Sequence, residues 1–319
     1  MKEDIKMSTI LRRTGKLSFS LLFILSLSIA AVVVTQAQPA SGGQATQPKK
    51  KKLPPGSKGF AQFAGRDASD KLITGGGTRN VPDPNKPEAD KTYDEAIQRG
   101  TEQYESGEYK EAVESFKKAI AVKPDQFVAY YSLGVSYEAL NMFKDAMEAY
   151  KRAITLKPDT ENQGREILAY YNLGNIHAAA GQHKEAVEVY QQVIQRHPNL
   201  WMVNYNMGLS QAALGQQKEA IGAFNTAINL RANEEEPRRD LELIHYNMGL
   251  AYSNDEQYEK ATDAFKQALK IKPDYAEARY NLGLVYYMLD NQSALIEQHK
   301  ILQTAKPEMA SELAKLIGK

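Results

Sequence analysis

The feature that most constrains the fold is a short motif that recurs along the second part of the chain. Each copy combines a tyrosine, a small polar residue, a leucine or methionine, and a glycine. The copies are Tyr131-Ser132-Leu133-Gly134, Tyr171-Asn172-Leu173-Gly174, Tyr205-Asn206-Met207-Gly208, Tyr246-Asn247-Met248-Gly249 and Tyr280-Asn281-Leu282-Gly283. One such unit cannot bury its apolar face alone, so neighbouring units have to stack. The recurrence favours a binding scaffold over an enzyme.

A common frame of about 34 residues aligns the copies when each glycine is placed at position 8. They then begin at Phe127, Ile167, Trp201, Glu242 and Ala276, and a more divergent copy begins at Tyr93. In every copy but the last, position 20 is alanine and position 24 is Phe or Tyr, and position 32 is usually proline: Ala112, Ala146, Ala186, Ala220, Ala261; Phe116, Tyr150, Tyr190, Phe224, Phe265; Pro124, Pro158, Pro198, Pro273. Small residues let two helices approach closely, and the proline ends the second helix. Each copy therefore predicts a pair of helices.

Turns and irregularities follow from the same frame. Residues near position 15 tolerate the left-handed conformation of a tight turn, and they include Gly107, Asn141, Gly181 and Gly215. Two inserts, 161–166 and 235–241, are predicted to lengthen the first helix of the following copy, with Pro237 in a first helical turn. Leu295, His299 and Leu302 depart from the frame in the last copy, which is predicted to act partly as a cap.

The frame resembles the tetratricopeptide repeat (TPR) over residues 93–309, about two thirds of the chain. The resemblance implies an all-α fold, a right-handed superhelical solenoid of antiparallel helix pairs with about six repeats, starting near residues 93, 127, 167, 201, 242 and 276. A C-terminal capping helix is expected over 308–319. In this family the first helices line a concave channel, and the second helices form the outer wall.

The resemblance places a candidate peptide-binding set at positions 5, 6 and 9 of the first helices. Asparagine amides can pair with an extended backbone of any sequence, and tyrosines add apolar area with a polar tip. The set is Tyr131, Tyr171, Asn172, Asn175, Tyr205, Asn206, Tyr246, Asn247, Tyr280 and Asn281. The alternative is that these residues only pack or bridge adjacent helices. The lysine-rich clamp of chaperone adaptors is not matched, because position 5 carries no lysine and position 2 is mostly apolar or acidic.

The N-terminus has the layout of an export signal. Basic residues precede an uncharged apolar run, Leu17 to Val34, and Thr35-Gln36-Ala37 follows as a small-x-small cleavage pattern. The run also reaches the lower limit of a membrane-spanning helix, about 18 residues. Residues 1–37 are therefore predicted to be a signal peptide cleaved near Ala37 or an N-terminal membrane anchor formed by residues 17–34. In both cases the rest of the chain is exported to the periplasm or the cell envelope, with membrane contact only through this segment.

Residues 38–92 are predicted to be a low-complexity, mostly disordered linker. A short docking element over 59–79 is the alternative for its middle part. Residues 38–91 hold ten basic and five acidic residues, against 25 basic and 32 acidic from Thr92 onward. A solenoid near −7 lacks the basic face of a nucleic-acid binder, so no nucleic-acid partner is expected. The basic run at 49–52 indicates a solvated spacer or weak attraction to an anionic surface.

No pattern indicates catalysis. The chain has no cysteine, which removes thiolate nucleophiles, thiolate metal sites and disulfides. None of the five histidines has the metal-helix spacing of H-E-x-x-H, and the glycine run at 75–77 lacks the context of a phosphate loop. We expect no enzyme activity, no cofactor and no metal.

Together these observations predict a non-catalytic protein–protein interaction scaffold or adaptor of the cell envelope, which binds a peptide or protein segment in its concave groove. An alternative is an accessory subunit of an envelope enzyme complex that grips the enzyme or a wall glycan. Self-association through exposed repeat ends is a third, structural alternative.

Overall fold

The structure is a computed structural model, and it describes residues 87–156, 158, 162–232 and 240–318. Every regular element in these ranges is a helix. The predicted signal or anchor and nearly all of the predicted linker lie outside them. Among the described helices, none has the length and apolar character needed to cross a bilayer.

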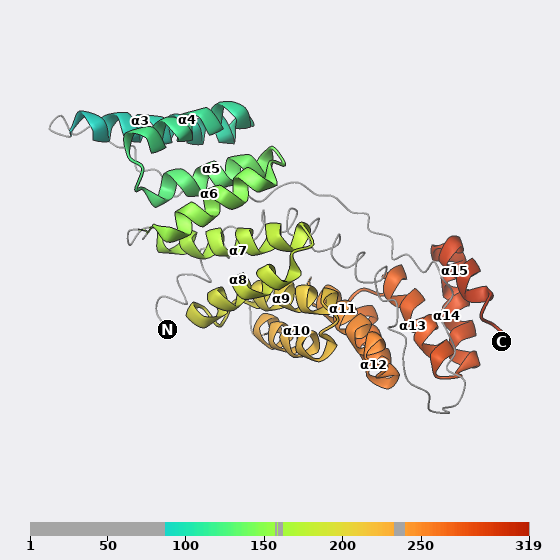
Figure 1. Cartoon of the computed structure of the whole chain (residues 1–319). Helices are drawn as coiled ribbons and strands as arrows, with labels where there is room; N and C mark the ends of the chain where they lie inside the picture. The colour runs from blue at the N-terminus through green and yellow to red at the C-terminus, as the bar shows by residue number, and fades with distance from the viewer. Residues whose placement is uncertain (1–86, 157, 159–161, 233–239, 319) are drawn as a thin grey trace. The chain divides into compact units, whose positions relative to one another are not determined.

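The helices follow one another as hairpins with short turns, and Figure 1 shows them in chain order from α3 to α15. Two compact units hold them, divided after Pro198. The described part of the first unit contains α3 (Glu88–Glu105), α4 (Tyr109–Val122), α5 (Phe127–Ala139), α6 (Phe143–Thr155), α7 (Gln163–Ala179) and α8 (His183–Arg196). The second contains α9 (Trp201–Ala213), α10 (Gln217–Ala232), α11 (Leu241–Asn254), α12 (Tyr258–Ile271), α13 (Ala276–Met288), α14 (Gln292–Ala305) and α15 (Pro307–Ala314). The predicted all-helical fold built from helix pairs is confirmed.

The glycine at position 8 allows the two helices of each pair to approach closely. A Cβ added to Gly100, Gly134, Gly174, Gly208 or Gly249 would lie 2.5 to 2.8 Å from the aromatic ring at position 24 of the same repeat. No side chain tolerates such a distance, so the glycine and the ring form one packing unit. The predicted reason for the glycine is confirmed.

In the last helix pair, a residue from outside the pair covers the glycine at position 8. Position 24 is His299 there, and the ring that would cover Gly283 is missing. Leu313 of α15 fills this place instead, because its Cδ1 lies 2.6 Å from the position of a Cβ on Gly283. Leu295, Leu302 and Leu313 are all fully buried. Helix α15 thus closes the second unit by inserting a leucine where the other repeats use their own aromatic ring.

The turns between paired helices all pass through a left-handed residue at position 15. Positive φ angles occur at the predicted Gly107, Asn141, Gly181 and Gly215, and also at Glu256 and Asp290. The turn prediction is confirmed, and it extends to Asp290, a residue type that is enriched in this conformation, and to Glu256, which is not.

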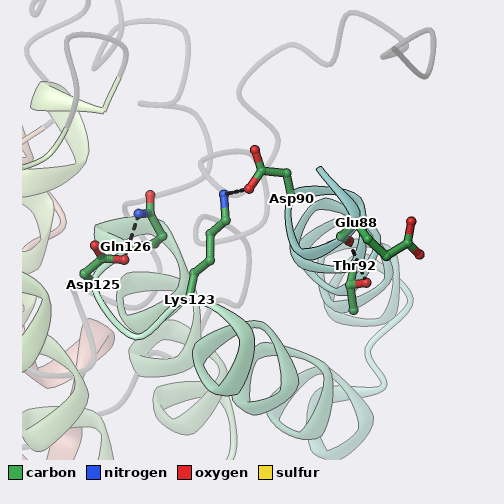
Figure 2. Close-up of polar contacts among 6 residues, drawn as sticks. All are labelled: Glu88, Asp90, Thr92, Lys123, Asp125 and Gln126. Atoms are coloured by element: carbon green, nitrogen blue, oxygen red, sulfur yellow. Dashed lines mark hydrogen bonds and ion pairs between the residues drawn. The ribbon is translucent and has the colours of Figure 1, made fainter. Parts of the chain in front are cut away.

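The first described helix begins earlier than the frame indicates. Helix α3 starts at Glu88, so residues 88–92 are helical and not part of the linker. Figure 2 shows two contacts at this end: the Thr92 hydroxyl donates to the Glu88 carbonyl (2.9 Å), and Lys123 pairs with Asp90 (2.5 Å). Acidic residues in a first turn are stabilised by the helix dipole. Lys123, which follows α4, thereby fixes the beginning of α3.

The two inserts behave differently. Helix α7 begins at Gln163, four residues before Ile167, so the first insert lengthens its helix as predicted. Helix α11 begins only at Leu241, and Asp240 lies in a turn, so the prediction for the second insert is wrong; Pro237 lies outside the described residues. An ion pair between the buried Arg231 of α10 and Asp240 (3.4 Å) joins the two sides of the second insert, with Asp240 just before the helix.

Candidate functional site

The tyrosines at position 5 are part of the core. Their exposed fractions are small: Tyr131 3%, Tyr171 6%, Tyr205 9%, Tyr246 8% and Tyr280 9%. In the first four of these repeats the ring lies against the ring at position 24, with centroid distances of 5.9 to 6.3 Å and tilted planes. This corrects the prediction that the tyrosines present broad apolar area to a ligand, because a tyrosine is long enough to reach back into the space between the paired helices.

The asparagines at position 6 bridge consecutive repeats. Asn247 donates to the Tyr205 hydroxyl (2.9 Å), and Asn281 donates to the Tyr246 hydroxyl (3.2 Å). Both amides also donate to a carbonyl one turn earlier in their own helix, Leu243 and Glu277 respectively. Asn206 is 7% exposed. These contacts match the bridging alternative; a further contact of the row with a peptide backbone stays a prediction.

The first unit contains a more polar version of this arrangement. Asn172 of α7 donates to the Tyr150 hydroxyl (3.1 Å), which donates to Oε2 of Glu138 on α5 (2.5 Å). In the next repeat the Tyr190 hydroxyl donates to Oδ1 of Asn175 (2.6 Å), and Asn175 is 5% exposed. Position 24 is a tyrosine in these two repeats and in no other. The predicted site residues Asn172 and Asn175 each form a hydrogen bond with one of these tyrosines.

Burial changes the proton affinity of this cluster. Burial raises the pKa of Glu138 to about 7, and the hydrogen bond from Tyr150 partly opposes this shift. Burial, together with the nearby Glu138 and Tyr131, also raises the pKa of Tyr150 well above its usual value. Glu138 is half-buried. Sequence reasoning missed it, although a signal was present: position 12 in the other repeats is Tyr104, Ala178, Ala212, Ser253 or Tyr287, none of them an acid.

A second set, which the sequence analysis used only to exclude a lysine clamp, stands at position 2. It consists of apolar side chains that are half-buried, one turn before the position-6 residue: Val128, Leu168, Met202 and Leu243. Valine and leucine here pack partly against the unit cores. They keep part of their apolar surface available, which the buried tyrosines do not.

The histidines have structural surroundings. His177 is buried, and its Nδ1 lies 2.7 Å from Gln182 Oε1 across the α7–α8 turn, which fits the expected packing role. Burial lowers the pKa of His183 and of His245. Within the described ranges, no three metal-binding side chains come together.

Comparison with protein families gives matches to repeat models along the described helices. A model described as TPR repeat matches residues 100–141 and 255–290, and models described as tetratricopeptide repeat match 127–160, 167–200 and 203–233. The chain belongs to the tetratricopeptide repeat family. No curated protein matches it.

Solved structures resemble this TPR protein in fold. The Cut9–Hcn1 hetero-tetramer of APC/C matches with 21% identity and a TM-score of 0.51, over 73% of this chain and 46% of that chain. YrrB, a TPR protein with an unusual peptide-binding site, matches with 22% identity and a TM-score of 0.51, over 60% and 96%. The pilF protein of Pseudomonas aeruginosa matches with 17% identity and a TM-score of 0.52, over 72% and 99%. This chain thus spans about half the length of Cut9–Hcn1 and nearly all of the other two. At these identities the likeness concerns the fold alone.

Proposed function

We propose that this TPR protein is a non-catalytic scaffold of the cell envelope that binds an extended protein or peptide segment along its first helices. The observation that carries the proposal is the half-buried apolar residue at position 2, repeated in successive first helices of each unit: Val128 and Leu168 in the first, Met202 and Leu243 in the second. An amide or hydroxyl stands one turn later in each of these helices.

This pattern suits a segment rather than a small molecule. Half-buried apolar side chains at regular intervals lose their remaining contact with water when a partner covers them, and their surroundings are already ordered. Each repeat contributes a similar small amount, so the binding energy is spread along the helices. The similar fold of YrrB, a TPR protein with an unusual peptide-binding site, supports the same use of such repeats.

The envelope location rests on the N-terminal sequence. The basic residues, the apolar run and the small-x-small pattern of residues 1–37 support export, by a cleaved signal or a retained anchor. N-terminal sequencing of protein from the envelope fraction separates the two: a chain starting at Gln38 indicates cleavage, and a chain starting at Met1 indicates an anchor.

Site-specific photo-crosslinking in cells tests the binding face. A photoreactive residue replaces Met202, which is half-buried on α9, in one full-length variant, and Asn225, which is exposed on α10, in the matched control. We expect the variant at 202 to cross-link to one defined segment of a partner, identified by mass spectrometry, and the variant at 225 not to do so. Equal labelling at both positions, or none at either, contradicts the proposed binding face.

A further inference from the structure

The Glu138 carboxylate is a half-buried acid among the described residues of the first unit, and the packing of the repeats does not explain it. One oxygen, Oε2, accepts the hydrogen bond from Tyr150 (2.5 Å). No lysine, arginine or histidine of the described chain pairs with this carboxylate. A carboxylate that is partly removed from water without a counter-ion is costly in its charged form.

The neighbouring repeats show that the tyrosine at position 24 does not need an acid. In the repeat of α7 and α8, Tyr190 donates to the neutral amide oxygen of Asn175 (2.6 Å). In three other repeats the hydroxyl is absent, because Phe116, Phe224 or Phe265 occupies the position. A neutral amide as the partner of the tyrosine, or a phenylalanine in place of the tyrosine, would thus suffice for packing. The packing of the repeats therefore does not require the charge of Glu138.

The charged groups around Glu138 leave its negative charge uncompensated. Among the described residues, Tyr150 of α6 is the titratable group that shifts the pKa of Glu138, and it lowers this pKa. On α4, Lys117 lies over the Tyr137 ring (5.9 Å) and pairs with Glu114 (3.0 Å). On α7, Arg165 donates to Asn162 (2.8 Å) and acts on Tyr131. On α3, the Tyr104 ring lies 5.1 Å from the ring of Tyr109.

We propose that Glu138, oriented by Tyr150 and Asn172, is a subsite for a lysine or arginine side chain of the bound segment. The inference rests on the proposed function and adds a specificity to it: the partner segment carries a basic residue that comes to lie over α5 and α7. The cation supplies a counter-ion that the described residues of the first unit do not provide. Hydrogen bonds from a charged donor to a carboxylate are among the stronger polar contacts in proteins.

Protonation gives the subsite a pH dependence. Burial raises the pKa of Glu138 to about 7. When the subsite is empty, the Glu138 carboxyl is therefore neutral in a large share of the molecules at pH 6 and charged in most of them at pH 8. Only the charged form attracts a cation. Binding should therefore strengthen as the pH rises from 6 to 8, and the bound cation should shift the pKa of Glu138 downward.

The test uses the full-length chain and a fluorescent tetralysine peptide with blocked ends as the probe. Glu138→Gln keeps a hydrogen-bond acceptor for Tyr150 but removes the charge. Glu148→Gln, on the exposed face of α6, removes an equal charge elsewhere and is the matched control. We expect Glu138→Gln to weaken binding about fivefold at pH 8 and to remove the change between pH 6 and pH 8, while Glu148→Gln binds like the unaltered chain.

Two further measurements show whether a lysine charge is needed and whether the cation comes from a partner or from the linker of this chain. A probe with acetylated lysines should lose the Glu138-dependent part of the affinity. Replacement of Lys49–Lys52 by glutamine should leave that part unchanged; a rise in affinity would make the chain's own linker the occupant and overturn the assignment to a partner. Equal losses for Glu138→Gln and Glu148→Gln overturn the subsite. If that happens while the cross-link from position 202 persists, the scaffold function stands without it.

Discussion

The six residues at position 15 all have a left-handed backbone conformation, but not all of their side chains predict it. Gly107, Gly181 and Gly215 signal the turn because glycine adopts a positive φ without strain. Glu256 has a φ of 59° with no such signal. The turn there is imposed by the packing of the two helices it joins, so it could be predicted from the frame but not from the residue.

Two glycines of one hairpin give a matched test of this point. Gly215 has a φ of 75°, whereas Gly222 lies within α10, and a Cβ at either would meet nothing within 4 Å. Gly215→Ala should lower the free energy of unfolding by about 1 kcal/mol through strain, and Gly222→Ala should raise it by about 0.5–1 kcal/mol through helix propensity. Urea denaturation of both full-length variants measures the two changes. Shifts of the same sign would contradict the backbone explanation.

At the scale of helix pairs, the sequence predicted where the helices lie better than it predicted which of their side chains are buried. The recurrence of glycine, alanine and an aromatic residue defines the pair, because these residues meet within one repeat. The tyrosine at position 5 lies against the ring at position 24 of its own repeat, a contact that the spacing of the two residues alone does not reveal. The tyrosines of the candidate site are buried and were not predicted to be, while the placement of the site on the first helices stays a prediction.

The bridge between Asn247 and Tyr205 predicts an energetic coupling between successive repeats. A double-mutant cycle with Tyr205→Phe and Asn247→Ala should give a coupling of about 0.5–1.5 kcal/mol in the free energy of unfolding, since a hydrogen bond of 2.9 Å is lost only once. Tyr205→Phe combined with Asn281→Ala is the control, because Asn281 donates to Tyr246 instead. Additivity in the first cycle, or equal coupling in both, would show that the asparagine row does not bridge repeats.

At the scale of the whole chain, the composition and the repeats predicted an all-helical array and a capping helix over 308–319, which α15 (Pro307–Ala314) matches, but not the contact by which this helix covers the last repeat. A solenoid exposes an apolar face wherever the stacking stops, and the chain must cover that face with something outside the frame. The residues that do so in the second unit follow no repeat pattern. Only the position of Leu313 over Gly283 identifies α15 as the element that replaces a missing ring.

This arrangement predicts a local response to damage at the cap. Leu313→Ala removes a fully buried side chain and leaves Gly283 uncovered, which should cost about 2–5 kcal/mol in the stability of the helices around it. Since each repeat depends on its neighbours, hydrogen exchange should accelerate strongly in α13, α14 and α15 and remain unchanged in α3 to α6. Ser311→Ala, at an exposed position of the same helix, should leave every exchange rate as it is. A uniform acceleration across all helices would mean that the chain unfolds as one cooperative body, and the nearest-neighbour account of its stability would have to be abandoned.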